Sequence, residues 1–405
     1  MAPSLADQEG ALADANDGGR ISKRLVFSYV VDWIFIAFTA ALGRIFHSLE
    51  PNRHLFSLND PSISYPYTIE ETVPVDVLIV VSLIVPAAVV LVFSLVFTPG
   101  LTVERHAPKG LAWRRKLWEW NAGWMGLGVA YAATYAATEG LKVLFGRPRP
   151  DLLSRCDPDL SDIRSHRVGV LASAEIVSWT ICRNASTKLV RDGFVSFPSG
   201  HASSSFAGLT YLSLWLCSKL CVSFPSIWKG RNRPDPRQTA FLVPGGLPSN
   251  SNDAFVQDDE LRCPSLVPLR NQDAAPPTYL LLIVMIPIAT AAYIASSRYV
   301  DNRHFGWDIL AGSALGVGFA YIGFRLYHLP LSSRAGWAWG PRSRDRAFFA
   351  GVGLTGYVGE EGTSSARDKL SSPKNGNTRV MTRTNTSASY IASRPCRVVN
   401  GHGES

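Results

Sequence analysis

Six stretches of the chain are almost wholly apolar, and each is long enough, or nearly so, to cross a lipid bilayer, which takes roughly 20 residues. They run over about residues 25–42, 77–97, 120–141, 202–224, 279–296 and 307–326. A single stretch of this kind could be a buried core helix, but six in one chain are typical of a membrane protein. The pattern predicts an all-α integral membrane protein whose six transmembrane helices form a bundle.

The polar stretches around these runs predict how the chain is organised. Residues 1–24 contain no apolar core, so we expect a cytosolic N-terminal segment and no cleavable signal peptide. Residues 25–326 form the six-helix transmembrane domain, interrupted by a flexible cytosolic insertion over 229–277 that is rich in Pro, Asn, Asp and Gly. Residues 327–405 are expected to form a cytosolic, largely disordered tail, which could rest on anionic lipid or, as its composition favours, remain solvated.

Charge decides the orientation. Only 18% of the residues are charged, which is low for a soluble domain, where about a quarter is usual. Basic residues gather before the first run (Arg20, Lys23, Arg24), between the second and third (Arg105, Lys109, Arg114, Arg115, Lys116) and after the fourth (Lys229, Arg231, Arg233, Arg237). All three groups lie on one side of a six-helix bundle, and the positive-inside rule makes that side cytosolic. The segment between the third and fourth runs is also rich in arginine, but long loops weigh less in this rule.

That long segment, residues 142–201, is then expected on the lumenal or extracellular side. It contains Asn184-Ala185-Ser186, an acceptor sequence for N-glycosylation. It also contains Cys156 and Cys182, which an oxidising compartment would allow to pair, although two free thiols remain the alternative. Both features agree with the orientation that the basic residues predict.

Three polar stretches with unusual chemistry lie at helix ends that the six-helix arrangement places on one face. The first closes the third run and extends to residue 151, the second precedes the fourth run over 196–201, and the third is the turn 298–308. Chance would scatter Lys, Arg, His and Asp over both faces of the membrane. We therefore expect one site, built from residues that are distant in sequence.

The turn between the fifth and sixth runs holds a candidate nucleophile. His304 and Asp308 are four residues apart, a spacing that places both side chains on one face at the start of a helix. The carboxylate would then accept the proton of one imidazole nitrogen and leave the other as a nucleophile or base. Lys142, Arg149 and Arg298 supply three cations, enough to bind a phosphate monoester dianion and the charge that builds during its transfer.

The start of the fourth run adds an anion site and a proton donor. Ser199 and Gly200 lie just before a helix, where backbone N–H groups and the helix dipole favour an anion. Gly200 leaves room for close backbone approach. His201 is suited to donate a proton to a departing alkoxide. An ordinary helix-starting turn would explain these residues separately, but not their joint position with the other two stretches.

Together these stretches resemble a known signature. Lys142 followed by Arg149-Pro150, then Pro198-Ser199-Gly200-His201, then Ser297-Arg298 followed by His304 and Asp308, is similar to the three-part motif of the type 2 phosphatidic acid phosphatases, the integral-membrane lipid phosphate phosphatases. The resemblance covers residues 25–326 and includes the fungal diacylglycerol pyrophosphate phosphatases. The insertion over 229–277 and the long tail depart from the pattern.

The resemblance implies a role for each matching residue. Lys142, Arg149 and Arg298 would bind the phosphoryl oxygens with the help of Ser199 and Gly200. His304 would attack phosphorus to form a phosphohistidine, Asp308 would orient it, and His201 would protonate the leaving oxygen and then activate water. No metal and no cofactor are expected. The substrates would be phosphatidate, diacylglycerol pyrophosphate, lysophosphatidate and related lipid phosphates, with no nucleic-acid partner and an undetermined oligomeric state.

Other functions remain open at this stage. The motifs recognise only the phosphate group of a substrate. A phosphatase for sphingoid-base, polyisoprenoid or sugar phosphates would therefore contain them as well. An inactive lipid-binding relative usually loses a catalytic histidine, and a transporter usually places its charges near mid-membrane, where only Asp32 and Lys219 lie more than a turn inside an apolar run. Haloperoxidases share this kind of site but are soluble. The vacuole, endoplasmic reticulum, Golgi and plasma membrane fit a lumenal or extracellular site equally.

Overall fold

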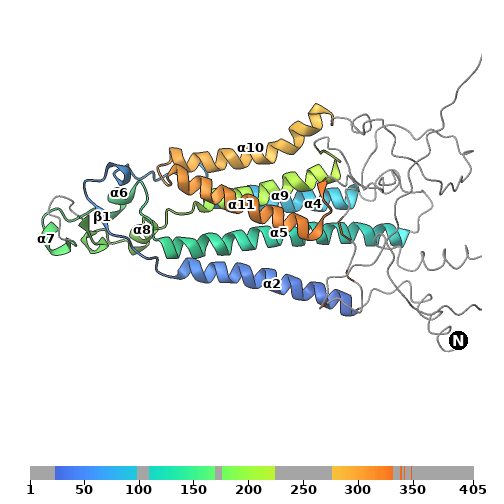
Figure 1. Cartoon of the computed structure of the whole chain (residues 1–405), viewed down its shortest axis with the longest axis horizontal. Helices are drawn as coiled ribbons and strands as arrows, with labels where there is room; N and C mark the ends of the chain where they lie inside the picture. The colour runs from blue at the N-terminus through green and yellow to red at the C-terminus, as the bar shows by residue number, and fades with distance from the viewer. Residues whose placement is uncertain are drawn as a thin grey trace, which may run out of the picture.

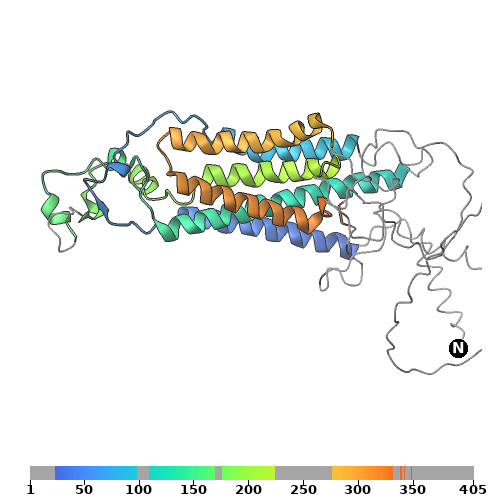
Figure 2. The ribbon, with the colours of Figure 1, turned by 45° about the horizontal axis from the view of Figure 1, so that its top comes forward.

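The computed structural model describes residues 23–97, 109–168, 176–223 and 276–331, together with residues 338, 339, 342 and 348. Most of the expected N-terminal segment, the insertion over 229–277 and the tail lie outside these residues. Long helical segments run side by side through the described part (Figures 1 and 2). They are α2 (Lys23–Ser48), a continuous segment made of α3 (Val75–Ile79), η2 (Val80–Ile84) and α4 (Val85–Val96), then α5 (Lys109–Phe145), α9 (Gly200–Lys219), α10 (Thr278–Val300) and α11 (Gly306–Tyr327).

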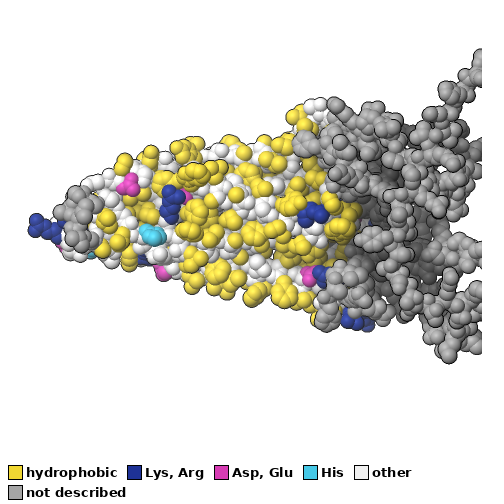
Figure 3. Space-filling view, viewed as in Figure 1, with side chains coloured by type: hydrophobic (Ala, Val, Ile, Leu, Met, Phe, Trp, Pro, Cys, Tyr) yellow, Lys and Arg dark blue, Asp and Glu magenta, His cyan; other side chains and the backbone are white. Residues whose placement is uncertain are grey.

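Four of these segments are long and apolar enough to cross a membrane: α2, the segment Val75–Val96, α10 and α11. The face of the bundle drawn in Figure 3 is covered mainly by hydrophobic side chains, as a lipid-facing surface requires. α5 and α9 are central and more polar: α9 packs against α5, α10 and α11, and most of its residues are buried. Each of the six expected apolar runs thus overlaps a helix, while membrane crossing by α5 and α9 stays a prediction.

The helix boundaries differ from the apolar runs at several places; α2, for example, continues to Ser48, six residues beyond the predicted boundary at 42. α5 begins at Lys109, so the basic residues Lys109, Arg114, Arg115 and Lys116 lie in its first turns and not in a loop as expected. Hydropathy finds only the apolar part of a helix, whereas Lys, Arg, Leu and Ala continue it well into a polar layer. α9 ends at Lys219, five residues before the predicted boundary at 224. Arg105 lies outside the described residues.

A backbone irregularity lies at the middle of the second helical segment. The π-helical turn η2 comes directly before α4, whose first turn contains Pro86, a residue with no N–H to donate. This turn approaches α9 closely, because a Cβ atom at Gly208 would lie 1.6 Å from the carbonyl oxygen of Ser82. Only glycine fits at this crossing.

The two charged residues that lie more than a turn inside an apolar run, Asp32 and Lys219, are both paired. Arg342 lies with its Nη2 atom 2.5 Å from Oδ2 of Asp32, and Lys219 forms a buried ion pair with Glu119. Glu119 also accepts a hydrogen bond from the backbone N–H of Ala338, at 2.8 Å. A buried charge needs a partner of this kind, since removing one partner of such a pair is strongly destabilising.

At the end of the bundle where α5 finishes, the described residues of 49–74 and 146–199 form a small unit that we call the cap (Figure 1). Strands β1 (Phe56–Ser57) and β2 (Ile176–Val177) pair antiparallel in it, with Phe56 opposite Val177. Around them lie η1 (Pro61–Ile63), α6 (Leu152–Cys156), α7 (Ile163–His166), η3 (Trp179–Ile181) and α8 (Thr187–Asp192). The cap has its own apolar core, which includes Phe56, Leu152, Val177, Ile181 and Phe194.

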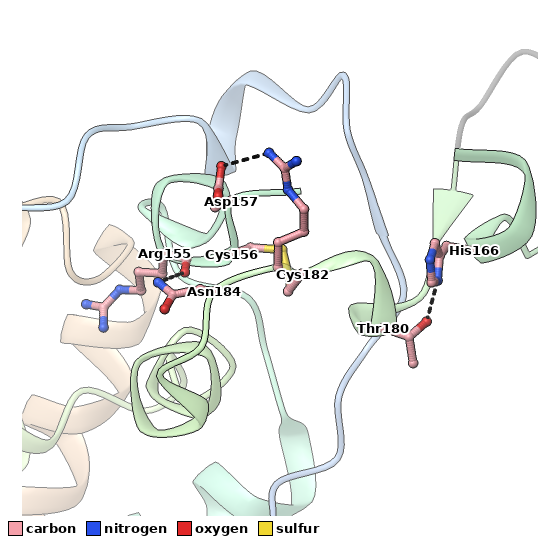
Figure 4. The surroundings of a disulfide bond; sticks show 8 residues. Arg155, Cys156, Asp157, His166, Thr180, Cys182 and Asn184 are labelled. Atoms are coloured by element: carbon pink, nitrogen blue, oxygen red, sulfur yellow. Dashed lines mark hydrogen bonds and ion pairs between the residues drawn. A yellow bond between two sulfur atoms is a disulfide. The ribbon is translucent and has the colours of Figure 1, made fainter. Parts of the chain in front are cut away.

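A disulfide between Cys156 and Cys182 crosslinks the cap (Figure 4). The two cysteines are 26 residues apart, and closing a loop of that length stabilises a fold by about 3 kcal/mol. Close to the disulfide, Nδ2 of Asn184 donates a hydrogen bond to the carbonyl oxygen of Arg155, at 2.8 Å. The predicted glycan acceptor atom therefore already has a structural partner, and glycosylation at Asn184 stays a prediction.

Candidate active site

The three polar stretches come together where the bundle meets the cap. They surround a cavity of about 810 Å³ that runs from the cap into the space between the helices. Six of the eight predicted site residues line it: Lys142, Arg149, Gly200, His201, Arg298 and His304. Ser199 and Asp308 are fully buried behind the cavity wall, with no side-chain atom exposed. Six of the predicted residues therefore lie around the cavity, and Ser199 and Asp308 are buried beside it.

Of the two predicted catalytic histidines, His304 is more deeply buried than His201. Only 3% of its surface is exposed, and its Nδ1 atom lies 2.7 Å from the carbonyl oxygen of Ser196. A carbonyl only accepts, so Nδ1 carries the proton and Nε2 keeps its lone pair. Burial lowers the pKa of His304 well below its usual value, and the nearby cations Arg149 and Lys142 lower it further. His304 is therefore a neutral imidazole that faces the cavity.

The expected hydrogen bond between His304 and Asp308 is wrong. Oδ2 of Asp308 lies 4.0 Å from Nδ1 of His304, beyond hydrogen-bond distance. It accepts instead from the Ser196 hydroxyl at 2.5 Å and from the Phe305 N–H at 3.1 Å, while Oδ1 accepts from Arg147 at 2.8 Å. Because Asp308 lies in the first turn of α11, its carboxylate caps that helix, and it reaches His304 only through Ser196.

Ser199 also departs from expectation. Its backbone N–H donates to the carbonyl oxygen of Asp308 at 3.0 Å, so it does not face an anion. Its side chain caps α9 by accepting from the Ala202 N–H, at 3.5 Å. Gly200 fits its prediction better, because a Cβ atom there would lie 2.9 Å from Nζ of Lys142. A glycine at this position lets the lysine ammonium approach the start of α9.

Every predicted cation has an acidic partner. Lys142 donates to Glu139 at 2.6 Å, and Arg149 donates to Asp192 at 3.0 Å. Arg298, which is 1% exposed, donates to Glu71 at 2.7 Å and also to Asp301. These pairs fix the direction of each donor before a ligand binds. The cations are held as a preformed cluster at one end of the cavity.

Asp192 links Arg149 of this cluster to Arg155, a second arginine of the cap. Its carboxylate accepts from Arg149 and, at 2.6 Å, from Arg155, which lies in α6. Burial alone would raise the pKa of Asp192, but the positive charges of Arg149 and Arg155 outweigh it and lower the pKa to about 2. Asp192 is thus ionised near neutral pH, and it fixes Arg149 within the cap.

His201 also lines the polar end of the cavity, beside Arg298. Its Nε2 atom lies 3.1 Å from the carbonyl oxygen of Val73 and 3.2 Å from Nη1 of Arg298. Glu71 is also near, with Oε2 at 3.9 Å from the same nitrogen. The second histidine therefore lies beside the arginine that is the strongest candidate for binding an oxyanion.

Several contributors escaped the sequence analysis. Glu71 and the residues around it come from the connection between the first and second apolar runs, and Arg303 comes from the turn that also carries His304. Asp301 binds Arg298, and Arg147 binds Asp308. One signal could have found Glu71, because its connection lies on the same face as the other three stretches in a six-helix arrangement. Asp301 and Arg303 lay within a stretch already selected, but no spacing rule singled them out.

The other half of the cavity is apolar. Its wall is made of Trp33, Ile36, Ala37 and Ala40 from α2, Leu78, Ile79 and Leu83 from the second segment, and Gly128, Tyr131, Ala132 and Tyr135 from α5. Small residues on the facing sides of α2 and α5 leave the space open. The cavity thus joins a cationic end, which carries His201 and His304, to an apolar groove.

Comparison with known proteins agrees with this arrangement. Residues 123–330 match the model of the PAP2 superfamily, and this range contains every predicted site residue. The chain is 28% identical to diacylglycerol pyrophosphate phosphatase 1 of Saccharomyces cerevisiae over 70% of its own length and 73% of that protein. It is 30% identical to a PA-phosphatase related-family protein of Dictyostelium discoideum, with 78% and 67% covered. It is 25% identical to lipid phosphate phosphatase 1 of Arabidopsis thaliana, with 79% and 73% covered. No solved structure matches the chain significantly.

Proposed function

Because the chain belongs to the PAP2 superfamily, we propose that it is a multi-pass membrane enzyme that hydrolyses the phosphate of lipid phosphates through a phosphohistidine intermediate. The observation that carries this proposal is the neutral His304, which lies where a cationic cluster meets an apolar groove. The names of the relatives support phosphatidate and diacylglycerol pyrophosphate as substrates.

Substrate binding begins with the cations. Lys142, Arg149 and Arg298 would each donate to the non-bridging oxygens of the phosphoryl group, in the way that planar guanidinium groups recognise phosphate. Because their directions are fixed by acidic partners, they need little reorganisation as charge builds in the transition state. Three fixed cations supply electrostatic stabilisation of the kind that a divalent metal gives elsewhere, so we propose that the reaction needs no Mg²⁺.

The chemistry then proceeds in two steps. In the first, Nε2 of His304 attacks phosphorus, the N–P bond forms, and the bond between phosphorus and the lipid oxygen breaks. His201 gives its proton to the departing oxygen. In the second, His201 removes a proton from water, the water oxygen attacks phosphorus, and the N–P bond breaks to release inorganic phosphate. Asp308 acts on this sequence by holding Ser196, whose carbonyl fixes the ring of His304.

The apolar groove supports a lipid substrate over a sugar phosphate. Lys142 and Gly128 both line the cavity and lie on α5, which rises 1.5 Å per residue, so the cavity extends about 21 Å along that helix. One leaflet of a bilayer core is about 15 Å deep. The groove is thus long enough for an acyl chain whose phosphate lies among Lys142, Arg149 and Arg298.

The orientation of the site is part of the proposal. Basic residues gather at the far end of the bundle, and a disulfide crosslinks the cap, which supports a lumenal or extracellular position for the active site. In this arrangement α5 and α9 complete six crossings, and the chain divides into the N-terminal segment, the membrane domain and the tail described above. The vacuole, endoplasmic reticulum, Golgi and plasma membrane all fit.

Filling the groove tests the proposed substrate class. Ala132 lies in α5 and lines the groove, so Ala132→Leu adds bulk where an acyl chain would lie. In detergent micelles with excess EDTA, we expect it to lower kcat/KM for long-chain phosphatidate about tenfold or more, while phosphatidate with very short chains loses less than threefold, because only the long chain reaches this position.

The control is Ala133→Leu, one residue along the same helix and half-buried, but not part of the cavity wall. It should leave both rates near wild type. Equal losses on both substrates with Ala132→Leu would reject the groove as the chain site. Glucose 6-phosphate hydrolysed faster than phosphatidate by the wild type would reject the lipid substrate class itself.

A further inference from the structure

A short segment of the cap lies along the polar end of the cavity. We call residues 68–73, which precede α3, the strap. The hydroxyl and the backbone N–H of Thr72 donate to Asp301, at 2.6 and 3.0 Å, and Arg303 donates to the carbonyl oxygen of Thr68 at 2.8 Å. The carbonyl oxygen of Val73 contacts His201. The strap is therefore tied to the turn that carries the proposed nucleophile and to the proposed proton donor.

From this strap, Glu71 reaches into the phosphate end of the cavity. Its Oε2 atom lies 2.7 Å from Nη1 of Arg298, and its Oε1 atom lies 3.2 Å from Nη2 of Arg303. The side chain of Glu71 is 24% exposed, against 2% for Arg298 and 5% for Arg303. The carboxylate thus covers both guanidinium groups on their open side, and the protein covers the other sides.

This geometry is that of an oxyanion bound by two arginines. A phosphoryl group held by Arg298 between the two histidines would need the same Nη1 donor that Glu71 now occupies, which also lies 3.2 Å from Nε2 of His201. A carboxylate and a phosphate dianion at the same guanidinium would repel each other. The two ligands therefore compete for one position.

Glu71 can leave this position without moving the strap. The contacts that tie the strap are made by Thr68, Thr72 and Val73, whereas those of Glu71 itself are made by its carboxylate. Rotation about its own side-chain bonds would move the carboxylate toward the open side of the cavity. Residues on either side would remain tied to Asp301 and His201.

We propose that Glu71 is an internal competitor for the phosphate site, which the substrate's phosphate displaces and which returns to Arg298 and Arg303 as inorganic phosphate leaves. This inference rests on the proposed role of Arg298 as a phosphate ligand. It predicts that Glu71 weakens the binding of both the substrate's phosphate and the inorganic phosphate product. Weaker binding of the product makes its release faster, although three cations surround it.

The test is equilibrium binding of radiolabelled inorganic phosphate to the full-length protein in detergent, with no lipid present. We expect Glu71→Gln to bind phosphate about tenfold more tightly than wild type, because the amide keeps the size of the side chain and removes its charge. The matched control is Glu70→Gln, at the neighbouring exposed carboxylate, which should bind phosphate as the wild type does.

Unchanged or weaker phosphate binding by Glu71→Gln would overturn the inference, as would a gain of equal size in Glu70→Gln. If Glu71→Gln does not fold, Glu71→Asp carries the test, since its shorter side chain draws the carboxylate back from both arginines and should also tighten binding. Binding is measured without turnover. Tighter phosphate binding by Glu71→Gln, in a protein that releases no phosphate from lipids, would support the inference and reject the proposed function. Unchanged phosphate binding in a protein that does release phosphate from lipids would support the proposed function and reject the inference.

Discussion

Replacing His304 by alanine is expected to lower phosphate release from phosphatidate by about 10⁴-fold or more, because removal of an attacking nucleophile leaves only the contribution of binding and charge stabilisation. His304 is buried and neutral, and its Nδ1 atom is fixed by the Ser196 carbonyl, so no other imidazole can take its place. The measurement is the initial rate of phosphate release in detergent micelles with excess EDTA.

His54→Ala is the control for this variant, since His54 is an exposed histidine of the cap. It should retain the wild-type rate. Retention of more than about one hundredth of the rate in His304→Ala would contradict the role given to His304. Thermal unfolding of both variants shows whether the loss comes from chemistry or from the fold, and we expect similar transitions.

Replacing Arg298 by lysine is expected to cost about 10²–10³-fold in kcat/KM, even though the positive charge is kept. The guanidinium donates through one nitrogen to Glu71 and through the other to Asp301, and this pairing directs it at the cavity. A lysine ammonium is a single point of charge and cannot keep the contact with Asp301 while presenting a donor to phosphate in the direction that Glu71 now occupies.

Arg325→Lys is the matched control, because Arg325 lies in the last turn of α11, at the far end of the bundle from the site. It should leave kcat/KM within threefold of wild type. A loss of the same size in both variants would mean that Arg298 matters only for folding. A loss below threefold in Arg298→Lys would show that charge alone suffices at this position.

The sequence predicts which segments meet, because apolar runs determine helices and helix order determines which ends share a face. In this way Lys142, His201 and His304 were assigned to one site, and the structure places all three around one cavity. The same reasoning missed α5's first turns, since Arg114 and Lys116 carry no apolar signal. Hydropathy reports burial in lipid and is silent on where a helix continues into polar surroundings.

The sequence predicts less well which atoms are bound to which. The spacing of His304 and Asp308 places both on one side of α11, but Asp308 has closer partners in Ser196 and Arg147. Which partner the carboxylate binds depends on differences of about 1 Å between interatomic distances, and the spacing of residues in the sequence cannot resolve such differences. Glu71 was missed for a related reason, because a carboxylate in an irregular connection has no periodicity, and only the folded chain brings it to Arg298.

Trapping the covalent intermediate tests the central claim most directly. The protein would be mixed with phosphatidate that carries ³²P in its phosphate, in excess EDTA, and quenched within milliseconds. The account predicts protein-bound label that is stable in alkali and labile in acid, maps to the peptide containing His304, and is absent from His304→Ala. Rapid phosphate release with no bound label, or label at another residue, would contradict it.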